Sequence, residues 1–106
     1  MFKLTEEQVN YIIEVYGGSK RIIRDIECRL NLLAIPMDDD EYYEIVAAVA
    51  AQKETIRNKA KNYTTREDAM SVWVSTDKLI LFALEEKYID FSNLNPEVQE
   101  RIRNFR

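Results

Sequence analysis

The sequence contains no histidine and a single cysteine, Cys28. Histidine is the usual acid–base group near neutral pH and the commonest metal ligand, so its absence excludes His-based triads and His-ligated metal sites. One thiol can form neither a zinc cluster nor an intramolecular disulfide, and we expect Cys28 to be a small buried residue. Phosphate-loop, dinucleotide-binding and nucleophile-elbow motifs are also missing. The sequence therefore predicts a protein that is not an enzyme and uses no metal or cofactor.

Long apolar runs are absent as well. The run 79–84 is far shorter than the roughly 20 residues of a membrane-spanning helix, and no basic segment followed by an apolar run opens the sequence as a secretory signal would. A composition of 46% hydrophobic and 32% charged residues is typical of a soluble globular domain. The net charge of −4 opposes general attraction to nucleic acid or anionic lipid. We therefore expect one cytoplasmic domain over 1–106, with neither a membrane nor nucleic acid as partner.

Glycine and proline are scarce, with two of each, and all four stand where helices should end or begin. Thr5 and the following residues 6–8 are typical of a capping box, Gly17 and Gly18 end that helix, and Pro36 prevents continuation of the next one. Apolar residues recur at helical spacing between these signals. The sequence therefore predicts an all-α fold, a compact bundle of about five helices over approximately 5–16, 19–34, 40–62, 66–88 and 96–104.

Two further expectations concern individual helices. Residues 26–32 alternate apolar and polar side chains, as a half-buried strand would, but Ile23 and Leu33 fit the helical period and we prefer the helix.

The predicted helix 66–88 is apolar over much of its circumference. Such a helix is typically buried, so we expect it to be the central one, with Trp73 in the core.

The densest acidic cluster surrounds the start of the third predicted helix. Its carboxylates can cap the helix and complement its dipole, and acidic side chains next to tyrosine also suit docking of a basic partner. A calcium loop would need oxygen ligands spread over about twelve residues around a turn glycine, which this segment lacks. The candidate partner-binding residues are Asp38, Asp39, Asp40, Glu41, Tyr42 and Glu44.

A second candidate site lies at the start of the second predicted helix. Small residues and cations there could hold an anion on free backbone N–H groups, although we prefer to interpret them as a helix stop followed by a cap. The segment could also form the turn and recognition helix, 19–30, of a DNA-binding helix-turn-helix, but Asp25 and Glu27 interrupt its basic face. The residues that would contact an anion or DNA are Ser19, Lys20, Arg21 and Arg24.

The acidic cluster takes part in two resemblances. Residues 38–43, followed by an alanine-rich helix, resemble the early part of small helical head–tail connector proteins of tailed phages, which implies a small phage structural protein as one alternative. The stretch from Glu41 to Leu79 resembles the helical half of the ZapA cell-division family. Neither resemblance assigns a site residue.

The expected function follows from the missing chemistry and the surface charge. We expect a non-enzymatic, acidic helical protein–protein interaction module: an adaptor, immunity protein or inhibitor of phage or bacterial origin, such as an inhibitor of a host nucleic-acid-handling complex. Its partner would be another protein with a basic surface, and a homodimer is compatible with the sequence. The first alternative is the helix-turn-helix regulator. A magnesium-dependent hydrolase would need carboxylates that face one another on neighbouring helices. The candidates are Glu67, Asp68 and Asp77 on the fourth predicted helix and Asp40, Glu41 and Glu44 on the third, but their spacing does not match an EExxE…ExxD pattern.

Overall fold

The computed structural model describes residues 2–87 and 89–104. Within them it contains six α-helices, one short 3-10 helix and no strand, so the predicted all-α class is confirmed. The alternating segment 26–32 is helical. None of the described helices combines the length and the apolar character that crossing a membrane requires. In chain order the elements are α1 (Glu6–Tyr16), α2 (Lys20–Leu32), α3 (Asp39–Lys61), α4 (Arg66–Ser71), α5 (Thr76–Glu86), η1 (Phe91–Asn93) and α6 (Pro96–Asn104).

Polar side chains at the helix starts explain where the helices begin. The capping box predicted for α1 is present: the Thr5 hydroxyl accepts from the N–H of Gln8 at 3.1 Å, and the Gln8 side chain accepts from the N–H of Thr5 at 2.9 Å. Each cap satisfies a backbone donor that the first turn of a helix leaves unpaired. Four other helices are capped in the same way, by the side chains of Ser19, Asp38, Thr65 and Ser75.

The turn between α1 and α2 uses both glycines, as predicted. Gly17 has φ +86° and Gly18 has φ +92°, a region that residues with a Cβ rarely adopt. A Cβ at Gly17 would also lie 3.0 Å from Cγ of Glu54 on α3. This turn therefore requires glycine both for its backbone conformation and for its close approach to α3.

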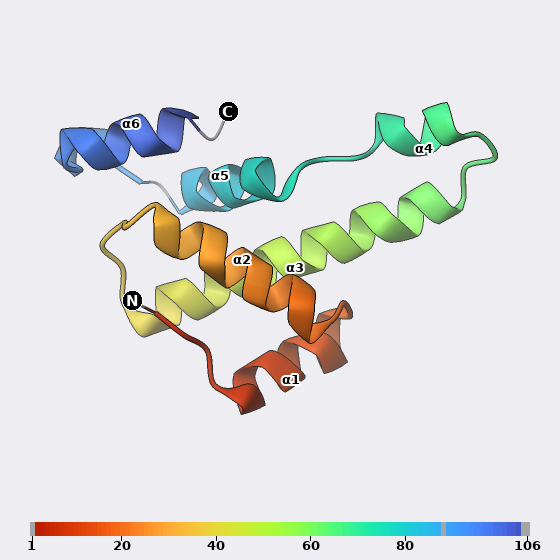
Figure 1. The fold of residues 1–106 in the computed structure, drawn as a ribbon, viewed down its shortest axis with the longest axis horizontal. Coiled ribbons are helices and arrows are strands. Elements are labelled where there is room, and N and C mark those ends of the chain that lie inside the picture. Colours follow the sequence, from red (N-terminus) through yellow and green to blue (C-terminus); the bar gives the residue numbers. More distant parts are fainter. Residues whose placement is uncertain (1, 88, 105–106) are drawn as a thin grey trace.

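α3 is the central helix of the fold and packs against α1, α2, α4 and α5. Figure 1 shows it crossing the molecule, with α1 and α5 on opposite sides in this view. The shortest dimension of the molecule is 20 Å, which corresponds to about two helix diameters. The prediction that the helix at 66–88 would be central is therefore wrong. The inward face of α3 is formed by Tyr42, Ile45, Val46, Ala47, Val49 and Ala50.

The predicted helix 66–88 is interrupted at residues 72–75, which separate α4 from α5. Two valines in this connection are β-branched and lose side-chain freedom in a helix. Ser75 then accepts from the N–H of Lys78 at 3.3 Å, so a new helix start competes with continuation. Tyr88, the predicted last residue of this helix, lies outside the described residues.

The interruption leaves two side chains in places that the sequence did not predict. Trp73 lies in the connection and is 54% exposed, and Met70 on α4 is 56% exposed. The expectation that Trp73 belongs to the core is wrong. The buried residues of this part of the chain lie on α5 instead; they are Leu79, Ile80, Leu81 and Leu84.

Cys28 is exposed, which corrects the expectation that it is buried. The buried stripe of α2 contains Ile23, Ile26, Glu27 and Leu30. Successive helical residues are about 100° apart, so Cys28 points away from this stripe. The packing of α2 against α3 determines which residues of α2 are buried. The small apolar character of Cys28 therefore does not place it in the core.

Candidate interaction site

The acidic residues predicted as a docking surface surround the first turns of α3. Asp38 caps the helix, and its carboxylate accepts from the N–H of Glu41 at 2.8 Å. Asp39 and Asp40 stand in the first turn, where the helix dipole favours negative charge. All of these residues and Glu44 are exposed. Capping and dipole interactions thus account for the three aspartates.

Tyr42 does not belong to this surface, and its prediction as a partner-binding residue is wrong. Its side chain is 1% exposed and its ring stacks on Phe2 with the centroids 4.9 Å apart. Its hydroxyl donates to the backbone carbonyl of Glu27 at 3.4 Å. Burial raises the pKa of Tyr42 above its ordinary value. The helical period turns residue 42 toward the core while residues 41 and 44 face solvent.

A groove lies between α3 and α5, next to the exposed face of α3. Its volume is about 490 Å³. Its lining mixes polar side chains with apolar ones, which include the small side chains of Ala48 and Ala83, and Phe82 is 43% exposed. Small residues allow a partner backbone to approach closely, and an exposed aromatic ring provides an apolar contact. The complete lining is Ala48, Val49, Gln52, Leu79, Phe82, Ala83, Glu85 and Glu86.

The spacing of residues along α3 connects the acidic cluster with this groove. Glu41 and Glu44 precede Ala48 and Gln52 by one to three turns, and at 3.6 residues per turn all four occupy the same face. On α5, Glu85 and Glu86 line the groove. Carboxylates from both helices therefore lie beside the apolar side chains of the groove.

A cation of the described part of the chain lies next to these carboxylates. Lys87, just after α5, pairs with Glu44 across the two helices. This hydrogen bond raises the pKa of Lys87, and Glu41 adds to the effect through its charge. Both partners are about half exposed, so solvent screens the pair and it contributes little to stability. Among the described residues, Glu41 and Glu86 add further negative charge beside the groove.

The basic residues predicted for anion or DNA contact are arranged differently. Ser19 caps α2 by accepting from the N–H of Ile22 at 3.3 Å. Lys20 pairs with Glu6 at 2.9 Å, and Arg24 pairs with Glu6 at 3.2 Å and with Glu27 at 2.7 Å. Hydrogen bonding to Glu27 raises the pKa of Arg24, and hydrogen bonding to Lys20 lowers the pKa of Glu6.

Three of the four proposed contacts, Ser19, Lys20 and Arg24, are therefore engaged within the chain. Arg21 is exposed and makes no ion pair with another described residue. The structure does not gather Ser19, Lys20, Arg21 and Arg24 into a free basic surface within the described residues.

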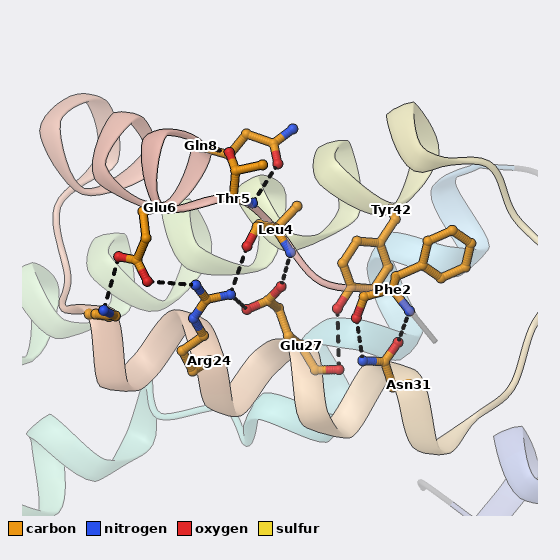
Figure 2. Close-up of polar contacts among 10 residues, drawn as sticks. Phe2, Leu4, Thr5, Glu6, Gln8, Arg24, Glu27, Asn31 and Tyr42 are labelled. Atoms are coloured by element: carbon orange, nitrogen blue, oxygen red, sulfur yellow. Dashed lines mark hydrogen bonds and ion pairs between the residues drawn. The ribbon is translucent and has the colours of Figure 1, made fainter.

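Glu27 is the residue that sequence reasoning missed. Among the described residues it is the only buried polar or charged one, with 4% exposed. Figure 2 shows its carboxylate between Arg24 and residues 2–4, which we call the N-terminal segment. There it accepts from the N–H of Leu4 at 2.6 Å. A signal was present in the sequence: position 27 lies on the same helical face as Ile23 and Leu30. A glutamate there has to find a partner.

The carboxylates considered for magnesium are not brought together. Asp77 pairs with Arg29 at 2.8 Å, and Arg29 also holds Asp25 at 3.0 Å. Glu67 and Asp68 stand in the first turn of α4. Within residues 2–87 and 89–104, no group of three or more His, Cys, Asp or Glu side chains is placed to hold a metal ion. The magnesium hypothesis gains no support from this placement.

Comparison with known proteins adds no family to this description. The resemblances to phage connector proteins and to the ZapA family stay expectations and assign no residue. No protein-family model, no curated protein and no solved structure matches this chain.

Proposed function

We propose that this protein is a non-enzymatic interaction module, an adaptor, immunity protein or inhibitor that binds a basic protein partner in the groove between α3 and α5. The observation that carries the proposal is the position of Glu41 and Glu44 on the same face of α3 as the groove residue Ala48. The acidic cluster is thereby joined to an apolar surface. A charged patch without an apolar neighbour would contribute mainly solubility.

The chemistry of the groove favours an amphipathic helix with basic edges. Such a helix lays apolar residues spaced i, i+3 and i+4 into a hydrophobic groove. Its apolar side chains would contact Ala48, Phe82 and Ala83, and its lysines or arginines would face Glu44 and Glu86. A second copy of this chain is less suitable, because a symmetric interface would place the same acidic residues opposite one another.

The two kinds of residue would do different work in binding. Exposed rim charges mainly accelerate association, and their effect falls with salt. Buried aromatic contacts mainly slow dissociation, and such residues carry a large share of interface energy. We therefore assign steering to Glu41 and Glu44 and anchoring to Phe82.

The helix-turn-helix alternative ranks below this proposal. Lys20 and Arg24 are paired with Glu6 and Glu27, so phosphate contacts would have to break those pairs. Ile23 and Ile26 of α2 are fully buried. Retention on DNA that falls steeply with salt would reverse this ranking.

The test is capture of a partner from the native host with two matched variants. Ala48→Arg places a large cation in the groove, whereas Asn58→Arg adds the same residue ten positions further along α3, outside the groove lining. Both positions are exposed helical sites, so both variants should keep the wild-type circular dichroism spectrum. We expect wild type and Asn58→Arg to retain the same protein and Ala48→Arg to lose it. Equal capture by all three would overturn the proposal.

A further inference from the structure

The N-terminal segment lies along α2 in an extended conformation, and side chains of α2 bind its backbone (Figure 2). Asn31 contacts both polar groups of Phe2: its Oδ1 accepts from the N–H at 3.3 Å and its Nδ2 donates to the carbonyl at 2.9 Å. Glu27 and Arg24 do the same for Leu4. The Glu27 carboxylate accepts from the N–H at 2.6 Å, and Nη1 of Arg24 donates to the carbonyl at 3.0 Å. All four backbone groups of two alternate residues are thus satisfied by one helix.

The geometry of helix and extended chain explains why this pairing fits. Asn31 and Glu27 are four helical residues apart, which is about 6 Å along the axis. Phe2 and Leu4 are two extended residues apart, which is about 6.7 Å. The two spacings nearly match, so one face of α2 can bind alternate residues of an extended chain much as a neighbouring strand would.

The side chains of the same two residues are bound as well. Leu4 is 4% exposed and belongs to the core, and Phe2 stacks on Tyr42. Lys3, between them, is exposed. The site therefore recognises an apolar residue, any residue and a second apolar residue, together with the backbone groups of the two apolar ones.

The protein's own segment leaves part of this face uncovered. A cavity of about 460 Å³ adjoins Phe2 and Lys3 on one side and Cys28, Asn31 and Leu32 on the other. Leu32 is 65% exposed. A longer peptide would cover this additional surface and gain contacts that residues 2–4 do not make.

We propose that the Arg24, Glu27 and Asn31 face of α2 is a binding site for an extended peptide of the pattern apolar–any–apolar. Residues 2–4 occupy it within the chain, and a segment of another polypeptide with the same pattern displaces them. None of Arg24, Glu27 and Asn31 lines the α3–α5 groove, so this inference and the proposed function stand or fall separately.

The probe is a labelled synthetic peptide with the sequence of residues 1–7, Met-Phe-Lys-Leu-Thr-Glu-Glu, titrated into the full-length protein with fluorescence polarisation as readout. The wild-type chain competes through its own segment at an effective concentration in the millimolar range. Phe2→Ala in the protein weakens that competitor and should tighten peptide binding about tenfold. Lys3→Ala changes an exposed residue of the same segment and should leave the affinity unchanged.

A modified peptide separates backbone recognition from general apolar adhesion. A peptide methylated on the Leu4 nitrogen keeps its side chains but cannot donate to Glu27, and the protein's own segment is unchanged. This peptide should bind at least about tenfold more weakly, whereas Arg21→Ala on the exposed side of α2 should not alter binding of the unmodified peptide. If Phe2→Ala loses the helical circular dichroism spectrum, Phe2→Leu replaces it and keeps an apolar side chain without the ring. Absence of peptide binding, equal affinity for wild type and the Phe2 variant, or undiminished binding of the methylated peptide would each overturn the proposal.

Discussion

Glu27 and Arg24 lie one turn apart on α2 with Oε2 and Nη1 at 2.7 Å, and this pair binds the N–H and the carbonyl of Leu4. The Glu27 side chain is 5% exposed and that of Arg24 is 24% exposed. A buried carboxylate is tolerated only when its oxygens are paired. The extended conformation of the N-terminal segment and the burial of Glu27 therefore depend on each other.

Glu27→Ala should be destabilising. The change leaves the N–H of Leu4 without its acceptor and removes one of the two carboxylates that pair with the partly buried guanidinium of Arg24, which keeps Glu6. Leaving a buried polar group unsatisfied typically costs about 1–3 kcal/mol. Urea unfolding measures the loss. Asp25→Ala, which removes a surface pair with Arg29, should cost less than about 1 kcal/mol. Similar costs for the two variants would contradict the role given to Glu27.

Trp73→Ala should have little effect on stability. The side chain is 54% exposed and lies in a connection, and surface substitutions usually change stability by about 0.5 kcal/mol or less. Ile80→Ala, at a fully buried position of α5, should cost about 2–5 kcal/mol. Thermal unfolding followed by circular dichroism compares the two. A larger loss of stability for Trp73→Ala than for Ile80→Ala would show that the Trp73 side chain belongs to the core.

Tyr42 should make stability fall at alkaline pH. Its pKa is near 10 in an unfolded chain, and burial raises it in the folded protein. Below about pH 10 both states keep the phenolic proton and the contribution of Tyr42 is constant. Above it the unfolded chain binds fewer protons than the folded one, so stability decreases as pH rises.

The measurement is the urea midpoint between pH 8 and pH 11 for wild type and Tyr42→Phe, with the phenolate absorbance as a second readout. The variant loses the hydroxyl and should show a flatter decline above about pH 10. Identical slopes for the two proteins would mean that Tyr42 titrates as an exposed tyrosine does.

Cys28 should react with a thiol reagent in the native protein. The side chain is exposed, so a disulfide reagent such as Ellman's reagent should modify it without denaturant, at a rate close to that in urea. Cys28→Ser is the control and should show no signal. Protection in the native state, relieved only by urea, would show that the thiol is covered.

Neutralising Glu41 and Glu44 should slow the binding of a basic partner. We expect Glu41→Gln with Glu44→Gln to lower the association rate severalfold and flatten its dependence on salt, because exposed charges steer encounter. Stability should change by less than about 1 kcal/mol. Glu7→Gln with Glu14→Gln on α1 removes the same charge elsewhere and is the control. Once a partner has been isolated, equal association rates and salt slopes for the two double variants would show that Glu41 and Glu44 do not steer binding.

Much of the helical structure was predictable because its signals are local. The capping box at Thr5 and the glycines at 17 and 18 act within a few residues, and the helices they delimit occur where the sequence predicts them. Among the docking residues, Tyr42 is corrected because it is in the core, whereas the three aspartates cap α3 or stand in its first turn and their part in docking stays a prediction.

The sequence by itself determined that the chain is helical, where most helices begin, and that histidine chemistry is absent, because caps, turns and composition need no distant partner. Only the tertiary structure decided that α3 is central, that Trp73 and Cys28 are exposed, and that Glu27 is buried beside Leu4. The physical reason is that a helical period shows which residues share a face but does not show which face is buried. Burial is assigned only when neighbouring helices and the extended N-terminal segment pack against one face and leave the other to water.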